Sequence, residues 1–210
     1  MDLAALYQRL YWHLGPQGWW PVQKRGRDHR FEIMVGAILT QNTAWTNVEK
    51  ALANLRLSAA MNPKQIIKMP SKRLAALIRP AGYFNQKTKK LKIFSHWLVK
   101  SGGLRSLKSL PTSQLRTKLL SLWGIGPETA DSILLYALER PVFVVDAYTR
   151  RLCSAAGIDA GDYGSCQRYF ESRLPRSRKL FNEYHALIVA WGKLYGNKKT
   201  RGEALNLVRA

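Results

Sequence analysis

Two glycines, Gly124 and Gly126, flank Ile125 between two stretches of helical periodicity. Glycines at such a point allow a tight turn and leave the neighbouring backbone amides uncovered. Pro127 suits the first position of the following helix, because that position needs no amide donor. Uncovered amides at the start of a helix can bind an anion such as a phosphate. Many helical hairpins use glycine only to turn, so the motif alone favours that plainer role.

A carboxylate, Asp146, follows the apolar and extended run 141–145. A new helical pattern covers 147–156, which places Asp146 at its N-cap position. An aspartate at an N-cap accepts hydrogen bonds from the first amides of the helix. The pattern therefore predicts a helix cap, and a chemical role for the same carboxylate is compatible with capping.

Tryptophans form a third group of candidates. Trp19, Trp20 and Pro21 lie in a loop rich in glycine, proline and basic residues. A helix or a strand would send neighbouring tryptophans to different faces, whereas a loop can aim both at one place. They either fill a gap between the first helix and the rest of the core or belong to a binding site. Trp45 follows the polar cluster 40–43 and is a further candidate.

One side of the helical pattern 85–101 is rich in lysine, and the other side is apolar. The lysines are Lys87, Lys89, Lys90 and Lys92. A solvated face is the commoner explanation of such a stripe, and a surface that faces phosphates is the alternative.

Composition points to a polyanionic partner. The 210 residues include 34 basic and 13 acidic ones, for a net charge of +21 and a pI near 10.4. So much positive charge costs self-repulsion and favours nucleic acid as the partner, with an anionic membrane surface as the rival. No stretch approaches the ~20 apolar residues of a membrane span, and no secretory signal is evident. Cys153 and Cys166 lack a metal-ligand spacing and suit a reducing cytosol, so neither a metal site nor a disulfide is expected.

The periodicity predicts an all-α protein whose length allows one large domain or two small ones. The almost wholly apolar helix 30–39 should be buried on most sides. The expected helices cover 3–14, 30–39, 44–55, two short segments that start at Asn62 and Pro70, 85–101, 113–122, 127–138, 147–156, 166–173 and 178–195.

The order of hairpin, apolar run, aspartate and new helix resembles the helix-hairpin-helix DNA glycosylases of the endonuclease III superfamily. The resemblance also covers the buried helix and turn at 31–41, the glycine turn and lysine-rich helix start at 79–89, and the segment 184–192. It therefore spans roughly residues 28–195.

The resemblance implies two helical lobes with the active site in the cleft between them. A six-helix lobe would cover 27–140 and contain the helix-hairpin-helix, and a second lobe would combine 1–26 with 141–210. Members of the family extrude a damaged nucleotide from the duplex and cut its N-glycosidic bond. The expected partner is double-stranded DNA that contains a damaged base. A monomeric bacterial protein of the cytoplasm and nucleoid is expected, with no membrane partner.

The family's functional residues correspond to particular positions of this chain. Asp146 takes the place of the catalytic aspartate, whose fixed charge stabilises the positive charge that develops on the sugar or orients the attacking water. Gln41 lies where relatives push a side chain into the gap left by the flipped base, although a helix-capping role fits it equally well. The residues expected to contact DNA are Gln41, Gly124, Ile125, Gly126, Glu128, Thr129, Lys87 and Lys89.

Three departures from the family's patterns narrow the expected activity. Glu128 stands where members that also nick the strand have a lysine, and a carboxylate cannot form a Schiff base with the sugar. Its plainer role is to favour the dipole at the start of a helix. Ala37 stands where adenine-mismatch glycosylases have a glutamate that protonates the base. The stretch after Tyr195 has no cysteine, so an iron–sulfur cluster cannot form there and no cofactor is expected.

These departures suit a monofunctional glycosylase for a base that alkylation has already made positively charged. Aromatic faces attract a cation, and the expected base pocket consists of Trp19, Trp20, Pro21 and Trp45. The pattern is most similar to the bacterial 3-methyladenine DNA glycosylases of endonuclease III type. The alternatives are a monofunctional glycosylase for another damaged base, such as a pyrimidine, and a non-enzymatic protein that binds damaged DNA.

Overall fold

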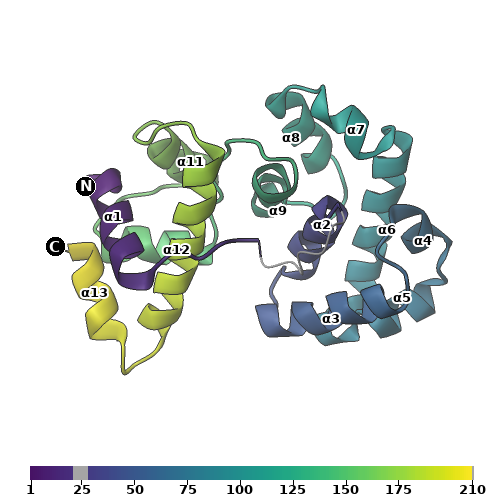
Figure 1. Ribbon diagram of the computed structural model, residues 1–210, viewed down its shortest axis with the longest axis horizontal. Coiled ribbons are helices and arrows are strands. Elements are labelled where there is room, and N and C mark those ends of the chain that lie inside the picture. The colour runs from purple at the N-terminus through teal and green to yellow at the C-terminus, as the bar shows by residue number, and fades with distance from the viewer. Residues whose placement is uncertain (21–27, 210) are drawn as a thin grey trace. The chain divides into compact units, whose positions relative to one another are not determined.

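The computed structural model describes residues 1–20 and 28–209. All regular structure in these residues is helical, which confirms the all-α class. The helices divide between two compact units, which Figure 1 shows as ribbons. Val22–Leu138 forms what we call the hairpin unit, and Met1–Pro21 together with Glu139–Ala210 forms the terminal unit.

The hairpin unit is built around α2 (Arg30–Leu39), in which every residue after Arg30 is buried. This uniform burial explains why the helix is apolar on all sides. Its one acidic residue, Glu32, pairs with Arg56 at 2.6 Å. The helical segments that pack on α2 include α3 (Trp45–Leu57), α6 (Phe84–Lys100), α9 (Pro127–Ser132) and η2 (Ile133–Ala137).

The remaining helices of this unit are short. They are α4 (Pro63–Lys68), α5 (Ser71–Leu77), the 3-10 turn η1 (Arg79–Ala81), α7 (Gly103–Lys108) and α8 (Thr112–Leu120). The sequence did not predict α7, because the glycine pair before it marks the end of a helix. Gly102 follows the end of α6 with a φ of +80°, and Gly103, with a φ of +77°, is already the first residue of α7.

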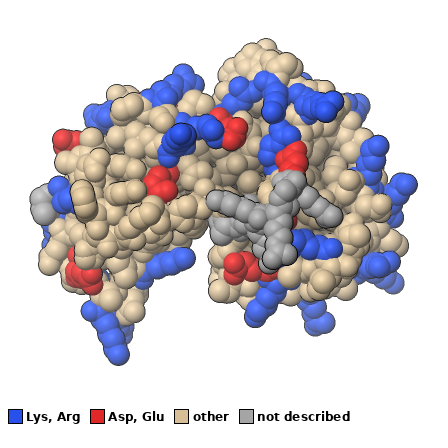
Figure 2. Space-filling model, in the orientation of Figure 1, with Lys and Arg blue, Asp and Glu red and all other residues tan. Residues whose placement is uncertain are grey.

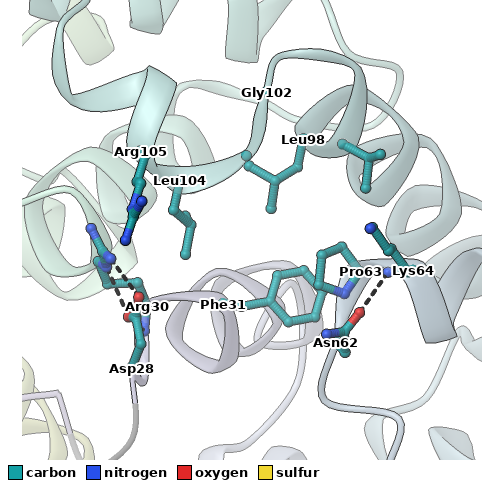
Figure 3. Close-up of a pocket in the computed structure, with 12 residues that line it drawn as sticks. Asp28, Arg30, Phe31, Asn62, Pro63, Lys64, Leu98, Gly102, Leu104 and Arg105 are labelled. Carbon is teal, nitrogen blue, oxygen red and sulfur yellow. Dashed lines mark hydrogen bonds and ion pairs between the residues drawn. The ribbon is translucent and has the colours of Figure 1, made fainter.

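A pocket of about 730 Å³ lies in the hairpin unit where the starts of α2, α4 and α7 meet the end of α6 (Figure 3). Phe31, Leu98 and Leu104 form its apolar floor, and Arg30 pairs with Asp28 at its edge. The pocket therefore adjoins the start of α2. The turn that contains Gln41 follows the other end of this helix, and Gln41 contacts the turn at Gly124.

The helix expected over 127–138 consists of two segments. After α9 the chain enters the π-helical segment η2 (Ile133–Ala137), where the amide of Leu138 donates to the carbonyl of Ile133 at 3.0 Å. All five residues of η2 are buried, so the apolar pattern is the same as that of a continuous α-helix. The sequence therefore could not reveal the wider turn.

The terminal unit is built around α12 (Arg178–Gly196). The helices that pack on α12 are α1 (Leu3–Leu14), α10 (Ala147–Ala155) and α13 (Arg201–Arg209), and α11 (Tyr163–Glu171) belongs to the same unit. The Tyr184 hydroxyl donates to the Leu3 carbonyl at 3.0 Å, and the Trp191 indole donates to the Ala204 carbonyl at 2.8 Å. Two buried hydrogen bonds thus tie helices from both ends of the chain to α12.

Basic side chains are spread over both units, as the face drawn in Figure 2 shows. Lysines and arginines exceed acidic residues by 34 to 13 in the whole chain. Within the described residues, no helix is both long and apolar enough to cross a membrane. The distribution of charge remains that of a protein with a polyanionic partner.

Candidate active site and DNA-binding hairpin

The hairpin turn between α8 and α9 depends on glycine at Gly124. Its φ of +81° is strained for any residue with a side chain. In addition, a Cβ at this position would lie 2.6 Å from Cε of Lys90, whose side chain packs against the turn. The Ile125 amide donates to the Leu122 carbonyl at 3.1 Å, and the Ile125 side chain is buried. The turn is therefore fixed by both backbone and packing.

Gly126 differs from Gly124 because the fold does not need glycine there. Its φ of −91° and ψ of 178° are ordinary extended values. A Cβ at Gly126 would meet no atom within 4 Å. The absence of a side chain leaves the start of α9 uncovered, as a phosphate would require.

Both ends of the Gln41 side-chain amide form hydrogen bonds, the nitrogen to the hairpin and the oxygen to α6. The amide nitrogen donates to the Gly124 carbonyl at 3.0 Å and to the Thr129 hydroxyl at 2.8 Å. The amide oxygen accepts a hydrogen bond from the Lys90 ammonium. Gln41 thus holds the turn in place, and insertion into DNA would first require these bonds to break.

An ion pair joins the two helices of the hairpin. Asp131 of α9 is fully buried, and Arg116 of α8 donates to its two oxygens at 2.7 and 3.0 Å. Such a two-pronged contact fixes both distance and orientation. This pair could not be predicted from the sequence, because both residues occupy ordinary polar positions of their helices.

Lys87 is not available to DNA. Its side chain is 2% exposed, and its ammonium donates to the carbonyls of Leu39 and Ala81, both at 2.8 Å, and to the Thr43 hydroxyl at 2.6 Å. Burial, together with the nearby charge of Lys90, lowers the pKa of Lys87 to about 8. All three N–H groups of the ammonium are used inside the unit, so the predicted contact between Lys87 and DNA is wrong.

The other lysines of α6 also have defined tasks. Lys92 donates to two carbonyls at the end of α4, at 2.6 and 3.0 Å. Lys89 is exposed, and its ammonium lies 4.3 Å from the centre of the exposed Trp123 ring. Because Trp123 directly precedes Gly124, Lys89 lies beside the hairpin. Of the two α6 lysines predicted to contact DNA, Lys89 is the one that the structure leaves suited to it.

Asp146 is the N-cap of α10, as its sequence position predicts. Its Oδ1 accepts from the amide and hydroxyl of Thr149 at 2.7 and 3.1 Å, and its Oδ2 lies 3.4 Å from Nε2 of His185. Burial raises the pKa of Asp146, but the charge and hydrogen bond of His185, helped by Thr149, outweigh burial and hold the pKa below its usual range. The carboxylate is therefore ionised although it is mostly buried.

Trp19 extends this group. Its ring centre lies 6.2 Å from that of His185, with the planes at 72°, and 5.9 Å from that of Trp20. The Gln17 amide donates to the Glu183 carboxylate of α12 at 2.5 Å, which ties the chain before Trp19 to the same helix. We call Trp19, His185 and Asp146 the Asp146 cluster.

The remaining predicted residues are dispersed. Trp45 is the first residue of α3 and is half-buried, and Ala37 is buried in α2. Glu128 is exposed in the first turn of α9, where an acid favours the helix dipole. Pro21 lies outside the described residues. The described residues among the predicted ones thus belong to two groups, with Trp19, Trp20 and Asp146 in the terminal unit and the others in the hairpin unit.

No motif or spacing in the sequence singles out His185. The residue lies in the apolar stretch of α12 and is 4% exposed. A histidine within a buried apolar helix needs a polar partner, and that requirement was the available signal.

Comparison with known proteins decides the family. The model for HhH-GPD superfamily base excision DNA repair proteins matches residues 35–176, a range that includes the hairpin and Asp146. The chain belongs to this superfamily. The resemblance to helix-hairpin-helix glycosylases is thereby confirmed, and the protein is a DNA glycosylase of base excision repair.

Two curated relatives and two solved structures illustrate the match. The chain is 43% identical over 202 residues to a Methanocaldococcus jannaschii protein provisionally named as a DNA repair glycosylase, covering 94% of this chain and 90% of that one. It is 29% identical over 140 residues to endonuclease III of Thermotoga maritima, covering 65% and 62%. The H. pylori 3-methyladenine DNA glycosylase bound to 1,N6-ethenoadenine gives a TM-score of 0.76 at 31% identity, covering 90% of this chain and 94% of that one. A trapped endonuclease III–DNA intermediate shares the fold, with a TM-score of 0.76 at 17% identity, covering 94% and 87%.

Proposed function

We propose that this glycosylase excises alkylated purines such as 3-methyladenine from double-stranded DNA and leaves an abasic site without cutting the strand. The observation that carries the proposal is the Asp146 cluster, in which a mostly buried, ionised carboxylate and the half-buried Trp19 ring both adjoin His185. The 31% identity to a 3-methyladenine glycosylase supports the same choice of substrate.

The parts of the cluster suit the chemistry of a cationic base. Cleavage of the N-glycosidic bond leaves positive charge on the sugar, and the Asp146 carboxylate stabilises that charge or orients the attacking water. An alkylated purine already carries a positive charge, so it leaves without an acid at Ala37. The face of Trp19 attracts such a cation with roughly 0.5–2 kcal/mol. Trp20, whose ring centre lies 5.9 Å from that of Trp19, is a further residue of the proposed base pocket.

The hairpin has a separate task, which is to bind the DNA backbone. The amides at the start of α9 donate hydrogen bonds to a phosphate, and Lys89 supplies a positive charge beside them. Gln41, Thr129 and the Arg116–Asp131 ion pair keep the turn rigid. Contacts of this kind position the duplex without selecting its sequence.

Release of free base from methylated duplex DNA tests the proposal. The wild-type protein should release 3-methyladenine, identified by chromatography, and should leave the strand intact until alkali cleaves it. Release only of a damaged pyrimidine would assign a different substrate. Tight binding of methylated duplex without any release would make the protein a damage-binding protein.

We also propose a cellular location, an oligomeric state and a cofactor content for the protein. We expect a cytoplasmic monomer that lacks an iron–sulfur cluster, because the segment after Tyr195 contains no cysteine. The purified protein should be colourless, contain no iron by elemental analysis, and elute at the mass of one chain.

Lyase activity should be absent, because Glu128 replaces the amine that would attack the sugar. Borohydride added during turnover should trap no covalent protein–DNA adduct above the level seen with the Asp146→Asn variant. An adduct mapped by mass spectrometry to any lysine would contradict the monofunctional assignment.

The two neighbouring tryptophans should respond differently to alanine. Trp19 is half-buried beside His185, so Trp19→Ala should lose 3-methyladenine excision with only a small drop in melting temperature. Trp20 is 9% exposed, so Trp20→Ala should lose ~3–5 kcal/mol of stability. Thermal melting and single-turnover excision measure the two effects. Full activity in folded Trp19→Ala would remove Trp19 from the base pocket.

Gly126→Leu should fold normally and bind every DNA duplex more weakly. The position has ordinary backbone angles and open space around a Cβ, so the leucine would project over the start of α9. We expect affinity to fall about tenfold, or ~1.4 kcal/mol, by fluorescence anisotropy at fixed salt. Gly202→Leu is the matched control, since a Cβ at Gly202 also meets no atom within 4 Å. Equal affinity of Gly126→Leu and wild type would remove the hairpin from the DNA interface.

A further inference from the structure

His185 lies between the carboxylate and the aromatic ring of the Asp146 cluster. Its Nε2 is 3.4 Å from Oδ2 of Asp146, and its ring is 6.2 Å from that of Trp19. The imidazole is 5% exposed, so water screens this interaction poorly. One buried side chain of α12 therefore touches both groups to which the proposed reaction assigns a task.

The two oxygens of Asp146 are held by different elements. Oδ1 receives two hydrogen bonds from Thr149, which are the ordinary bonds of a helix cap. Oδ2 faces His185 instead. Capping accounts for the first oxygen and leaves the second one without a structural explanation. A buried carboxyl tends to take up a proton, and a neutral carboxyl cannot stabilise a developing positive charge.

Among the described residues, His185 contributes the main charge that acts on Asp146. Arg150 of α10 donates instead to the Gly161 carbonyl at 3.0 Å. The Tyr163 hydroxyl of α11 accepts from the Val145 amide at 3.4 Å. The contacts of α1 and α13 with α12 include the Tyr7 ring and the Leu3 and Ala204 carbonyls, which carry no charge.

We propose that His185 is a positioning residue for base excision, which keeps the Asp146 carboxylate ionised and oriented and orders the Trp19 ring beside it. This role rests on the proposed function, because it assigns His185 a task in that reaction. It differs from a purely structural role in one measurable respect. Loss of the imidazole should make excision more sensitive to acid, and a simple packing defect should not.

The direction of the pH effect follows from the charge pair. The carboxylate must be deprotonated to act, so the rate falls as the pH drops through the pKa of Asp146. His185 lowers that pKa, and its removal therefore moves the acid limb of the rate profile to higher pH. At pH 8 the variant should keep much of its activity, and at pH 5 it should lose about tenfold more than wild type does.

Single-turnover excision between pH 5 and pH 9 tests this in His185→Ala and His185→Gln. Glutamine keeps a hydrogen-bond donor without a charge, so it should partly restore the rate at pH 8 but not the acid tolerance. His13→Ala is the matched control, since His13 forms an exposed pair with Glu203 at 2.6 Å in the same unit. Melting curves confirm folding. Acid limbs that coincide in wild type and both His185 variants would overturn the proposal.

A second measurement does not depend on turnover. Carbon-13 NMR of aspartate-labelled protein follows the Asp146 carboxyl directly, with Asp146→Asn providing the assignment. The carboxyl should titrate at higher pH in His185→Ala and His185→Gln than in wild type. An unchanged titration would refute the role of His185 even if the enzyme acts on another lesion. Failure of wild type to release any alkylated base, with the titration shifted, would instead refute the proposed function.

Discussion

Asp146→Asn should abolish base release while DNA affinity remains close to that of wild type. Asparagine keeps the oxygen that accepts from Thr149, so the cap of α10 survives. The negative charge is lost, and with it the stabilisation of the cationic transition state. We expect single-turnover excision of 3-methyladenine to slow about a thousandfold or more.

Asp162→Asn provides the matched control for this change. Asp162 caps α11 with the same geometry, accepting from the Ser165 amide at 2.7 Å, but it lies on the surface away from His185. The Asp162→Asn variant should excise at the wild-type rate. Wild-type turnover by Asp146→Asn would mean that Asp146 is a cap and nothing more.

Lys87→Met should destabilise the protein by about 3 kcal/mol without a direct effect on DNA binding. Methionine fills the space of the lysine stem but removes the donor that bonds the Leu39 and Ala81 carbonyls and the Thr43 hydroxyl, and Ala81 then keeps only the bond from the Thr43 hydroxyl. Each buried acceptor that loses its partner costs about 1–3 kcal/mol. The ammonium at the end of α2 also complements the helix dipole there. Urea denaturation measures the free energy of unfolding.

Lys89→Met is the control on the same helix. Lys89 is exposed, so its replacement should change stability by no more than about 0.5 kcal/mol and should weaken DNA binding instead. The opposite result, with Lys89→Met unstable and Lys87→Met defective only in DNA binding, would restore the predicted phosphate contact of Lys87.

The helical class and most helices follow from local periodicity, since a helix packed on one side repeats its apolar residues. The missed helices lacked that signal. Only Ala204 and Val208 are buried in α13, and the glycine pair masks the start of α7. Three segments, α2, α6 and α12, carry long apolar stripes, and the sequence predicts them well.

The residues of the candidate site also differ in whether the sequence predicts them. The turn at Gly124 and the cap at Asp146 are predictable, because turns and caps depend on residues a few positions apart. Lys87 and His185 are not, since the groups that define them are distant in sequence. Lys87 donates to a carbonyl 48 residues away. A lysine stripe on a helix looks the same whether it faces water, phosphate or the interior.

The hydrogen bond between Tyr184 and Leu3 joins residues 181 positions apart, which has a consequence for the order of assembly. The hairpin unit is one continuous segment, so it can fold on the ribosome while the remaining chain is still being made. The terminal unit cannot form until α12 has emerged, and contacts of such long range form slowly. Trp19 is synthesised before the hairpin unit and His185 after it, so the two can meet only once the hairpin unit and α12 have both been made. A nascent chain with a folded hairpin unit would therefore be able to bind DNA before it is able to cleave a glycosidic bond.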